Sequence, residues 1–188
     1  MQAHLLTTLE ENPIIIAIKD EAGLAACLEN EKPVVFVLYG SVTGIPQIVQ
    51  QLKAGQKTVF VDVDLLDGLA AREAAVDYLR QSTQADGIIS TKAALVRRAK
   101  SLGFATVYRT FLLDNMALQS LHKTGVQSGA DFIEILPGVC PKLIGRLAPG
   151  LGRPLIASGL VADKEDVIAA LSAGAVAVSS TSPAVWQL

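Results

Sequence analysis

Short runs rich in Val and Ile alternate along the chain with longer segments whose apolar residues recur at helical spacing. Each short run is closed by Gly, Pro, Asp or Ser, as is typical of a strand followed by a loop. Because the runs are apolar at almost every position, they indicate parallel strands covered on both faces by helices. The predicted strands are 14–18, 34–39, 58–64, 87–90, 105–110, 132–136, 154–157 and 175–179.

Eight strand–helix units predict the α/β class and a small (β/α)8 TIM-like barrel, because 188 residues leave only about 23 per unit. The alternative is an open, doubly wound sheet, which usually carries a GxGxxG turn after its first strand. No such turn follows 14–18, and the loop at 39–44 has only two glycines. No linker or low-complexity tract divides the chain, so we predict one domain over 1–188 that begins with a polar segment at 1–12.

The composition narrows the class of protein further. With 51% hydrophobic and 18% charged residues, the chain can bury a large core. A net charge of −2 gives no global positive field, so any contact with nucleic acid needs a local basic patch. Cys27 and Cys140 lie outside any CxxC pair, as expected of reduced thiols, and His4 and His122 lack metal-ligand spacing. Without a signal peptide or an apolar stretch of roughly 20 residues, we expect a cytoplasmic protein that binds no metal, cofactor or membrane.

The last two predicted strands end in small polar residues. Ser158 and Gly159 follow the seventh strand, Ser179 ends the eighth and Ser180 follows it. In a closed barrel, the loops after these two strands commonly bind a phosphate group through backbone N–H groups, together with a short extra helix. Ser and Gly are also ordinary loop residues. Their position after strands seven and eight favours a phosphate site.

Two aspartates end the third predicted strand. Asp62 and Asp64 share one face by the two-residue alternation of a strand. We expect both at the barrel mouth, because an unpaired charge beneath a helix would be costly. A functional role and a structural role, as a helix cap or an ion-pair partner of Lys92, both stay open. Lys92 itself could hold an anion, cap a carboxylate or, with less support, form a Schiff base.

An arginine and a glutamate interrupt two otherwise apolar strands. Arg109 lies near the end of the fifth strand and Glu134 in the middle of the sixth. Opposite charges on neighbouring strands can pair, which is the common reason that buried charges are tolerated. The same pair would orient a polar ligand.

Basic residues gather in two predicted helices. Arg97, Arg98 and Lys100 form a run in the fourth unit, and Lys142 and Arg146 lie four residues apart on one helical face. These five residues are the candidate RNA-binding surface. Such a run on a helix is more often a solvated face.

Six segments in series cover nearly the whole chain and together resemble the glycerol uptake operon antiterminator regulatory protein family. They are DVDLLDGL (62–69), DGIISTK (86–92), RTFLLD (109–114), DFIEILPGVCP (131–141), IASGL (156–160) and GAVAVSSTSPAVW (174–186).

The resemblance implies a TIM-barrel-like regulator that senses glycerol 3-phosphate and acts on leader mRNA to prevent premature transcription termination. The family's characteristic positions correspond to Asp64, Ser90, Thr91, Arg109, Asp114, Glu134, Pro137, Gly138, Gly159 and the loop at 179–182.

The chain departs from the family pattern at a few positions. Asp62 stands where the family has His, Lys92 where it has Arg, Ser158 where it has a second Gly, and Ile16 where Pro is frequent. The aspartate adds negative charge near the anion site. It would weaken binding of a dianion unless Arg109 or Lys92 neutralises it, which leaves open a different ligand.

The leading hypothesis is therefore a regulator without enzymatic activity whose partners are glycerol 3-phosphate and leader mRNA. The alternative is an isomerase, epimerase or lyase of a small sugar phosphate on the same barrel. Positive mean hydropathy and low charge also suggest a homo-oligomer. The predicted ligand-binding residues are Asp62, Asp64, Ser90, Lys92, Arg109, Glu134, Gly138, Ser158, Gly159, Ser179 and Ser180.

Overall fold

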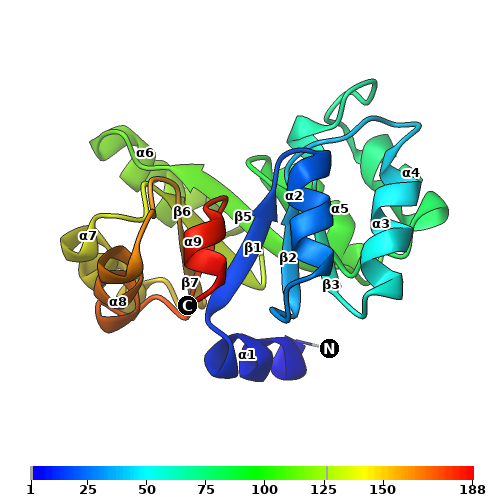
Figure 1. The fold of residues 1–188 in the computed structure, drawn as a ribbon. Coiled ribbons are helices and arrows are strands. Elements are labelled where there is room, and N and C mark those ends of the chain that lie inside the picture. The colour runs from blue at the N-terminus through cyan, green and yellow to red at the C-terminus, as the bar shows by residue number, and fades with distance from the viewer. Residues whose placement is uncertain (1, 126) are drawn as a thin grey trace.

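A computed structural model, which describes residues 2–125 and 127–188, shows a closed barrel of parallel strands that neighbour one another in chain order (Figure 1). β8 pairs with β1, where Ser180 lies opposite Ile16. This confirms the predicted (β/α)8 barrel. The strands are β1 (Ile14–Ile18), β2 (Val34–Val37), β3 (Thr58–Asp62), β4 (Gly87–Ser90), β5 (Ala105–Phe111), β6 (Phe132–Leu136), β7 (Leu155–Ser158) and β8 (Ala177–Ser180).

Seven of the predicted strand ends differ from the structure by one or two residues, including the end of the second strand, which lies at Val37 and not at 39. β3 ends at Asp62, because the next residues form the 3₁₀ helix η1 (Val63–Leu65). Asp64 therefore lies in a helical turn and not in the strand. The last strand begins at Ala177 and not at 175, since the N–H of Ala175 bonds back to the carbonyl of Ala170 at the end of the preceding helix.

Helices surround the barrel (Figure 1). Aspartates at the N-caps of three of them, Asp20, Asp114 and Asp163, each accept a hydrogen bond from the third backbone N–H that follows. None of the described helices is long and apolar enough to cross a membrane. The helices are α2 (Glu21–Leu28), α3 (Ile45–Ala54), α4 (Glu73–Ser82), α5 (Ala93–Ser101), α6 (Asn115–Ser120), the π-helix η2 (Leu121–Gly125), α7 (Pro141–Leu147), the 3₁₀ helix η3 (Ala148–Gly150), α8 (Lys164–Ser172) and α9 (Pro183–Trp186).

The segment predicted only as polar forms a further helix, α1 (Gln2–Glu11), which lies across the end of the barrel where the strands begin (Figure 1). Leu5 and Leu9 are buried against side chains of the barrel interior. These leucines are four residues apart and share one helical face. The helix therefore closes the lower end of the lumen.

The lower lumen is filled by apolar side chains. Phe36 and Phe60 pack with their ring centroids 5.4 Å apart, and Ile89, Val107 and other inward-facing residues complete the cluster. Gly87 makes room for this packing, since a Cβ there would overlap the Phe60 ring. The alternate residues of the strands, such as the β3 valines, face the helices in a separate cluster.

Two residues further along the same inward faces, the side chains become polar. Asp62 follows Phe60, Arg109 follows Val107, and Glu134, Ser158 and Ser179 occupy the equivalent places on β6, β7 and β8. The lumen is thus apolar below and polar at the mouth, where the strands end.

Candidate functional site

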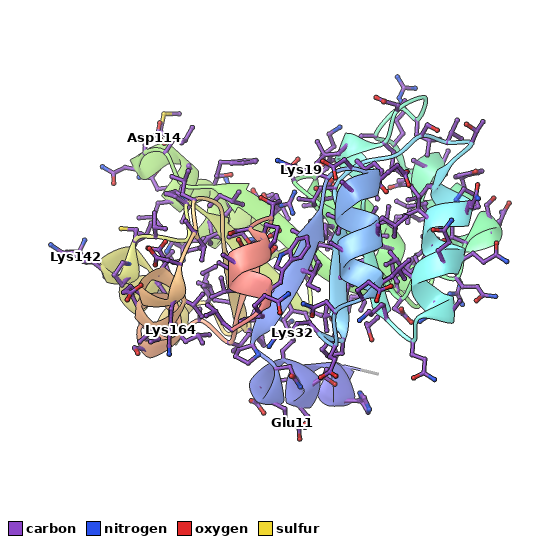
Figure 2. All side chains as sticks on the ribbon, in the orientation of Figure 1. Glu11, Lys19, Lys32, Asp114, Lys142 and Lys164 are labelled. Carbon is purple, nitrogen blue, oxygen red and sulfur yellow. The ribbon has the colours of Figure 1, made fainter. Side chains whose placement is uncertain are left out.

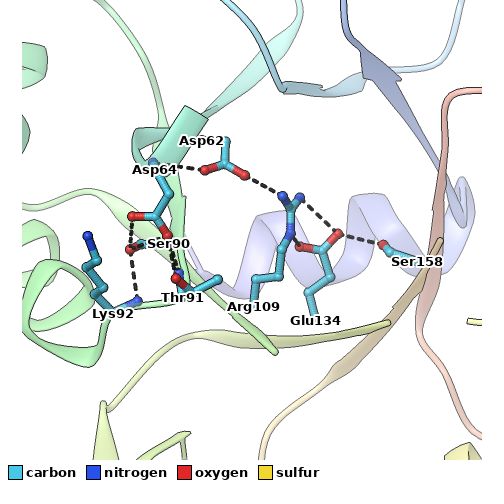
Figure 3. A network of polar contacts seen from close by, with 8 residues as sticks. All are labelled: Asp62, Asp64, Ser90, Thr91, Lys92, Arg109, Glu134 and Ser158. Carbon is cyan, nitrogen blue, oxygen red and sulfur yellow. Dashed lines mark hydrogen bonds and ion pairs between the residues drawn. The ribbon is translucent and has the colours of Figure 1, made fainter. Parts of the chain in front are cut away.

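Arg109 is held between two carboxylates at the mouth of the barrel (Figure 3). Its Nε donates to Glu134 Oε2 at 2.6 Å and its Nη2 to Oε1 at 3.3 Å, across the β5–β6 pair in which the two residues lie opposite each other. Its Nη1 donates to Asp62 Oδ2. The predicted Arg109–Glu134 pair is therefore present, and it is joined by Asp62. The side chains are 8%, 0% and 3% exposed for Arg109, Glu134 and Asp62.

The remaining atoms of this network are also satisfied. Ser158 Oγ donates to Glu134 Oε1 at 2.6 Å, and the Asp64 N–H donates to Asp62 Oδ1 at 3.0 Å. Asp62 thereby caps η1, which is the structural role left open by the sequence. Within the described residues no buried side-chain nitrogen or oxygen lacks a partner. A fully satisfied buried network of this kind holds its members in one arrangement.

Burial and charge shift the acid–base properties of the network. Burial raises the pKa of Asp62 to about 6, against the lowering effect of Arg109, and the nearby Asp64 and Glu134 carboxylates raise it further. For Arg109, burial lowers the pKa, but Glu134 and Asp62 outweigh this and raise the pKa above its usual value. The guanidinium stays charged. The raised pKa means that Asp62 titrates at about pH 6.

A second cluster joins the loops after β3 and β4. Asp64 accepts hydrogen bonds from Ser90 Oγ at 3.0 Å and from the Thr91 N–H and Oγ1, both at 2.7 Å. Lys92 Nζ instead donates to the carbonyl of Ala71 at 3.3 Å, and Figure 3 shows no contact between Lys92 Nζ and the Asp64 carboxylate. The alternative ion pair between Lys92 and an aspartate is therefore absent from the described contacts. Asp64 serves to tie the two loops together.

A cavity of about 520 Å³ opens above the mouth between β6, β7 and β8. Predicted ligand residues that line it are Arg109, Glu134, Ser158, Gly159, Ser179 and Ser180. The sequence reasoning missed its apolar wall, formed by Ala17, Leu38 and Leu136. The sequence signal that could have identified them is their place at or just after the end of a strand, on the side of the strand that faces the lumen.

The loop after β7 has an unusual backbone. Gly159 and Leu160 both have positive φ, 78° and 63°. The left-handed region costs a residue with a side chain roughly 1–2 kcal/mol, and Leu160 is 77% exposed, so packing of its own side chain does not offset this. Within the described residues no hydrogen bond uses the N–H of Leu160, or that of Thr181 in the loop after β8. Two free backbone donors therefore come from the loops that the sequence assigned to phosphate.

Two predicted ligand residues have structural roles in these loops. The Gly138 N–H donates to the Gly159 carbonyl at 3.0 Å, and a Cβ at Gly138 would lie 2.7 Å from the Ser158 backbone nitrogen. Gly138 thus permits close backbone approach. Ser180 Oγ donates to the Val161 carbonyl at 2.8 Å and so links the two loops, whereas Ser179 lies on the lumen side of β8.

The basic residues do not form one surface. Arg98 pairs with Asp77 at 2.7 Å and Lys100 with Asp131 at 2.8 Å, on the side of the barrel that carries α5. Lys142 and Arg146 lie on α7, on the other side (Figure 1; Figure 2). The remaining member, Arg97, is exposed. In the described part of the chain, no group of three or more His, Cys, Asp or Glu side chains could hold a metal ion.

Residues 14–186 match the family described as glycerol-3-phosphate responsive antiterminator. The chain belongs to this family. A solved structure of the glycerol uptake operon antiterminator regulatory protein from Listeria monocytogenes is 29% identical, with a TM-score of 0.91 over 94% of this chain and 95% of that one. A glycerol uptake operon antiterminator-related protein from Thermotoga maritima is 32% identical, with a TM-score of 0.80 over 93% and 98%.

The chain is also similar to a protein that is not named for glycerol uptake. The uncharacterized protein YgcP of Escherichia coli K12 is 42% identical over 184 residues, which cover 98% of this chain and 96% of that protein. The antiterminator family thus assigns the chain to a class of regulators. The particular ligand has to be argued from the residues of this cavity.

Proposed function

We propose that the chain is a transcription antiterminator that responds to a small phosphorylated polyol, glycerol 3-phosphate, and acts on a leader mRNA. The family supports the regulatory role. The observation that carries the ligand class is the cavity, which has the Arg109–Glu134 pair on one side and two loops of small residues on the other. Its volume of about 520 Å³ suits a small molecule.

The two sides of the cavity offer different chemistry. We place the phosphate against the loops after β7 and β8, where Leu160 and Thr181 have free N–H groups and Ser179 offers a hydroxyl. The hydroxyl end of the ligand then faces Glu134, whose carboxylate accepts hydrogen bonds and is fixed by Arg109 and Ser158. Asp64 and Ser90 are hydrogen-bonded to each other, and we assign them the role of holding the neighbouring loops in place.

Calorimetry with glycerol 3-phosphate and with glycerol tests the assignment. We expect the phosphate ester to bind at least a hundredfold more tightly, since a charged group held by several N–H donors contributes several kcal/mol. Equal affinity for the two compounds, or no binding of either, would remove the phosphate site.

The RNA part of the proposal needs a separate measurement. Ligand binding would order the two loops and shift the protein toward a state with higher affinity for RNA. Leader RNA should therefore bind more tightly in the presence of glycerol 3-phosphate. Because Arg98 and Lys100 already pair with carboxylates, charge reversal at exposed Arg97 should affect the salt dependence most on that side, and Arg146→Glu tests the other side.

One observation favours an enzyme as the second candidate. Asp62 has a pKa of about 6 and lies in a buried cluster, as expected of a general acid or base. Against this, no lysine, histidine or cysteine is among the described residues that line the cavity. Turnover of a triose phosphate that is lost in Asp62→Asn would establish the enzyme and contradict a pure sensor.

A further inference from the structure

The polar layer at the mouth contains more negative than positive charge. Asp62 and Glu134 are both ion-paired to the same guanidinium, and the described ion pairs give this cluster no second cation. Lys92, the nearest candidate in the sequence, is turned toward the Ala71 carbonyl. With both carboxylates ionised, the formal charge is −1, from two carboxylates and one guanidinium.

The surplus charge lies in a poorly solvated place. The three side chains are at most 8% exposed, so water screens them little, and Arg109 and Glu134 line the cavity directly. The raised pKa of Asp62 shows the same effect, because the site takes up a proton more readily than an exposed carboxylate does.

The carboxylates also keep acceptor capacity. A carboxylate has about four acceptor positions. Glu134 receives hydrogen bonds from Arg109 Nε, Arg109 Nη2 and Ser158 Oγ, and Asp62 receives them from Asp64 N and Arg109 Nη1. Glu134 therefore has room for one more donor at the cavity surface. An ammonium group supplies three donors and the missing positive charge, whereas a hydroxyl supplies one donor and no charge.

We propose that Asp62 determines effector specificity: the surplus negative charge that it adds beneath the cavity selects a small phosphate monoester whose other end carries a primary ammonium group over glycerol 3-phosphate. This rests on the proposed function, because it uses the same cavity and the same phosphate loops. It changes the preferred effector from a phosphorylated polyol to an amino alcohol phosphate, while the phosphate end and the loops that hold it stay the same. Asp62 acts by charge through Arg109, and Glu134 makes the direct contact.

A matched pair of ligands tests this inference. Glycerol 3-phosphate and 3-amino-2-hydroxypropyl phosphate have the same length and the same phosphate, and differ in one hydroxyl that becomes an ammonium group. Calorimetry at pH 7.5 should give the amino compound about tenfold tighter binding, as expected of one partly compensated charge in a buried site. In Asp62→Asn the ratio should fall to about one, because the surplus charge is gone.

Glu10→Gln is the matched control, since it removes one negative charge from the exposed face of α1 at the opposite end of the barrel. Its affinity ratio should equal that of the unaltered protein. A ratio of one or less in the unaltered protein, with both ligands bound, overturns the charge selection but leaves the phosphate site standing. Binding of neither ligand overturns the phosphate site and this inference together.

A second measurement on the unaltered protein covers the case in which Asp62→Asn does not fold. Lowering the pH from 8 to 5 protonates Asp62, which faces Arg109, Asp64 and Glu134. The ammonium group lowers the phosphate pKa of the amino compound, so the affinities are compared per dianionic fraction of each ligand, as measured by titrating the free ligands. The preference for the amino compound should decrease about tenfold over this range, and a constant ratio overturns the inference.

Discussion

At the scale of single residues, Arg109 is the residue that connects the polar network at the mouth of the barrel. It is the shared partner of two carboxylates that are almost fully buried. Removing it leaves both without compensation, whereas each of the smaller polar groups around it has a single role. The consequences of changing Arg109 should therefore be larger than those of changing any exposed arginine.

We expect Arg109→Met to lower the free energy of unfolding by about 3–5 kcal/mol at pH 7, because it leaves buried charge uncompensated. Urea denaturation measures this. The loss should shrink at pH 5, where Asp62 is protonated. Arg97→Met, at an exposed position on α5, should stay within about 0.5 kcal/mol of the unaltered protein. Equal effects of the two substitutions would contradict the role of Arg109.

Asp62 makes a separate prediction about pH. Its pKa rises from 3.8 in the unfolded chain to about 6 in the folded protein, so the folded state binds the proton more tightly. Its contribution to stability is present below about pH 4 and is lost as the pH rises through 6. Over this window the unaltered protein should lose about 3 kcal/mol relative to Asp62→Asn. If the free energy of unfolding of the two proteins changes with pH in parallel, the pKa of Asp62 is not raised in the folded protein.

The residue scale also shows what sequence reasoning can reach. Arg109 and Glu134 stood out as charges in apolar strands, and their pairing followed from adjacent strands. The orientation of the Lys92 side chain could not be predicted. A long, flexible lysine can reach either a nearby carboxylate or the Ala71 carbonyl, and the sequence does not show which acceptor it contacts. The setting of Asp64 depended on where β3 ends, which the alternating pattern does not determine.

At the scale of elements, the loops after β6 and β7 act as one unit. Gly138 packs against the backbone of β7 and donates to Gly159. The shape of the loop that carries the free Leu160 N–H therefore depends on a residue outside the cavity. Sequence patterns mark such glycines but do not say which backbone they approach.

Gly138→Ala should weaken binding of the phosphate ligand by about tenfold or more, because the new methyl group would push the β7 loop away by displacing the Ser158 nitrogen. Calorimetry measures the loss. Gly150→Ala is the matched control, since nothing lies within 4 Å of a Cβ there and its φ is not positive. If both variants bind like the unaltered protein, the close approach at Gly138 does not shape the site.

The helix α1 predicts the opposite combination of effects. Leu9 is buried in the lower lumen, so Leu9→Ala should cost about 2–5 kcal/mol of stability. Ligand affinity of the folded fraction should not change, because α1 lies at the far end of the barrel. Thermal unfolding and calorimetry on the same sample separate the two quantities, with Glu10→Ala as the exposed control. A loss of affinity without a loss of stability would contradict this division.

At the scale of the whole molecule, the regular alternation of strand and helix patterns predicted the barrel. Eight parallel strands that are apolar on both faces are compatible with few other folds. The role of the N-terminal segment did not follow, since two leucines in a polar helix do not reveal that they pack into the lower end of the lumen. The separation of the basic helices is likewise a property of the closed ring and not of local sequence.

Exposed apolar side chains near the end of β5 offer a surface through which the predicted homo-oligomer could form. Phe111 ends β5, and Leu113 and Met116 follow it; all three are at least half exposed, with Leu113 at 85%. We expect sedimentation at micromolar concentration to show self-association that Leu113→Asp weakens. Lys123→Asp on the adjoining η2 should have little effect. A monomer under all these conditions would remove the expectation.

The division of the lumen has a consequence for how such proteins diversify. Among the described residues, the apolar half of the lumen is the one closed by α1, and the polar side chains of the lumen lie in the half that opens to solvent. A substitution such as Asp62→Asn changes the charge beneath the cavity and leaves the apolar packing of the lower lumen in place. Related regulators can therefore keep the same apolar lower half of the barrel and change the ligand that they bind through single substitutions at the mouth.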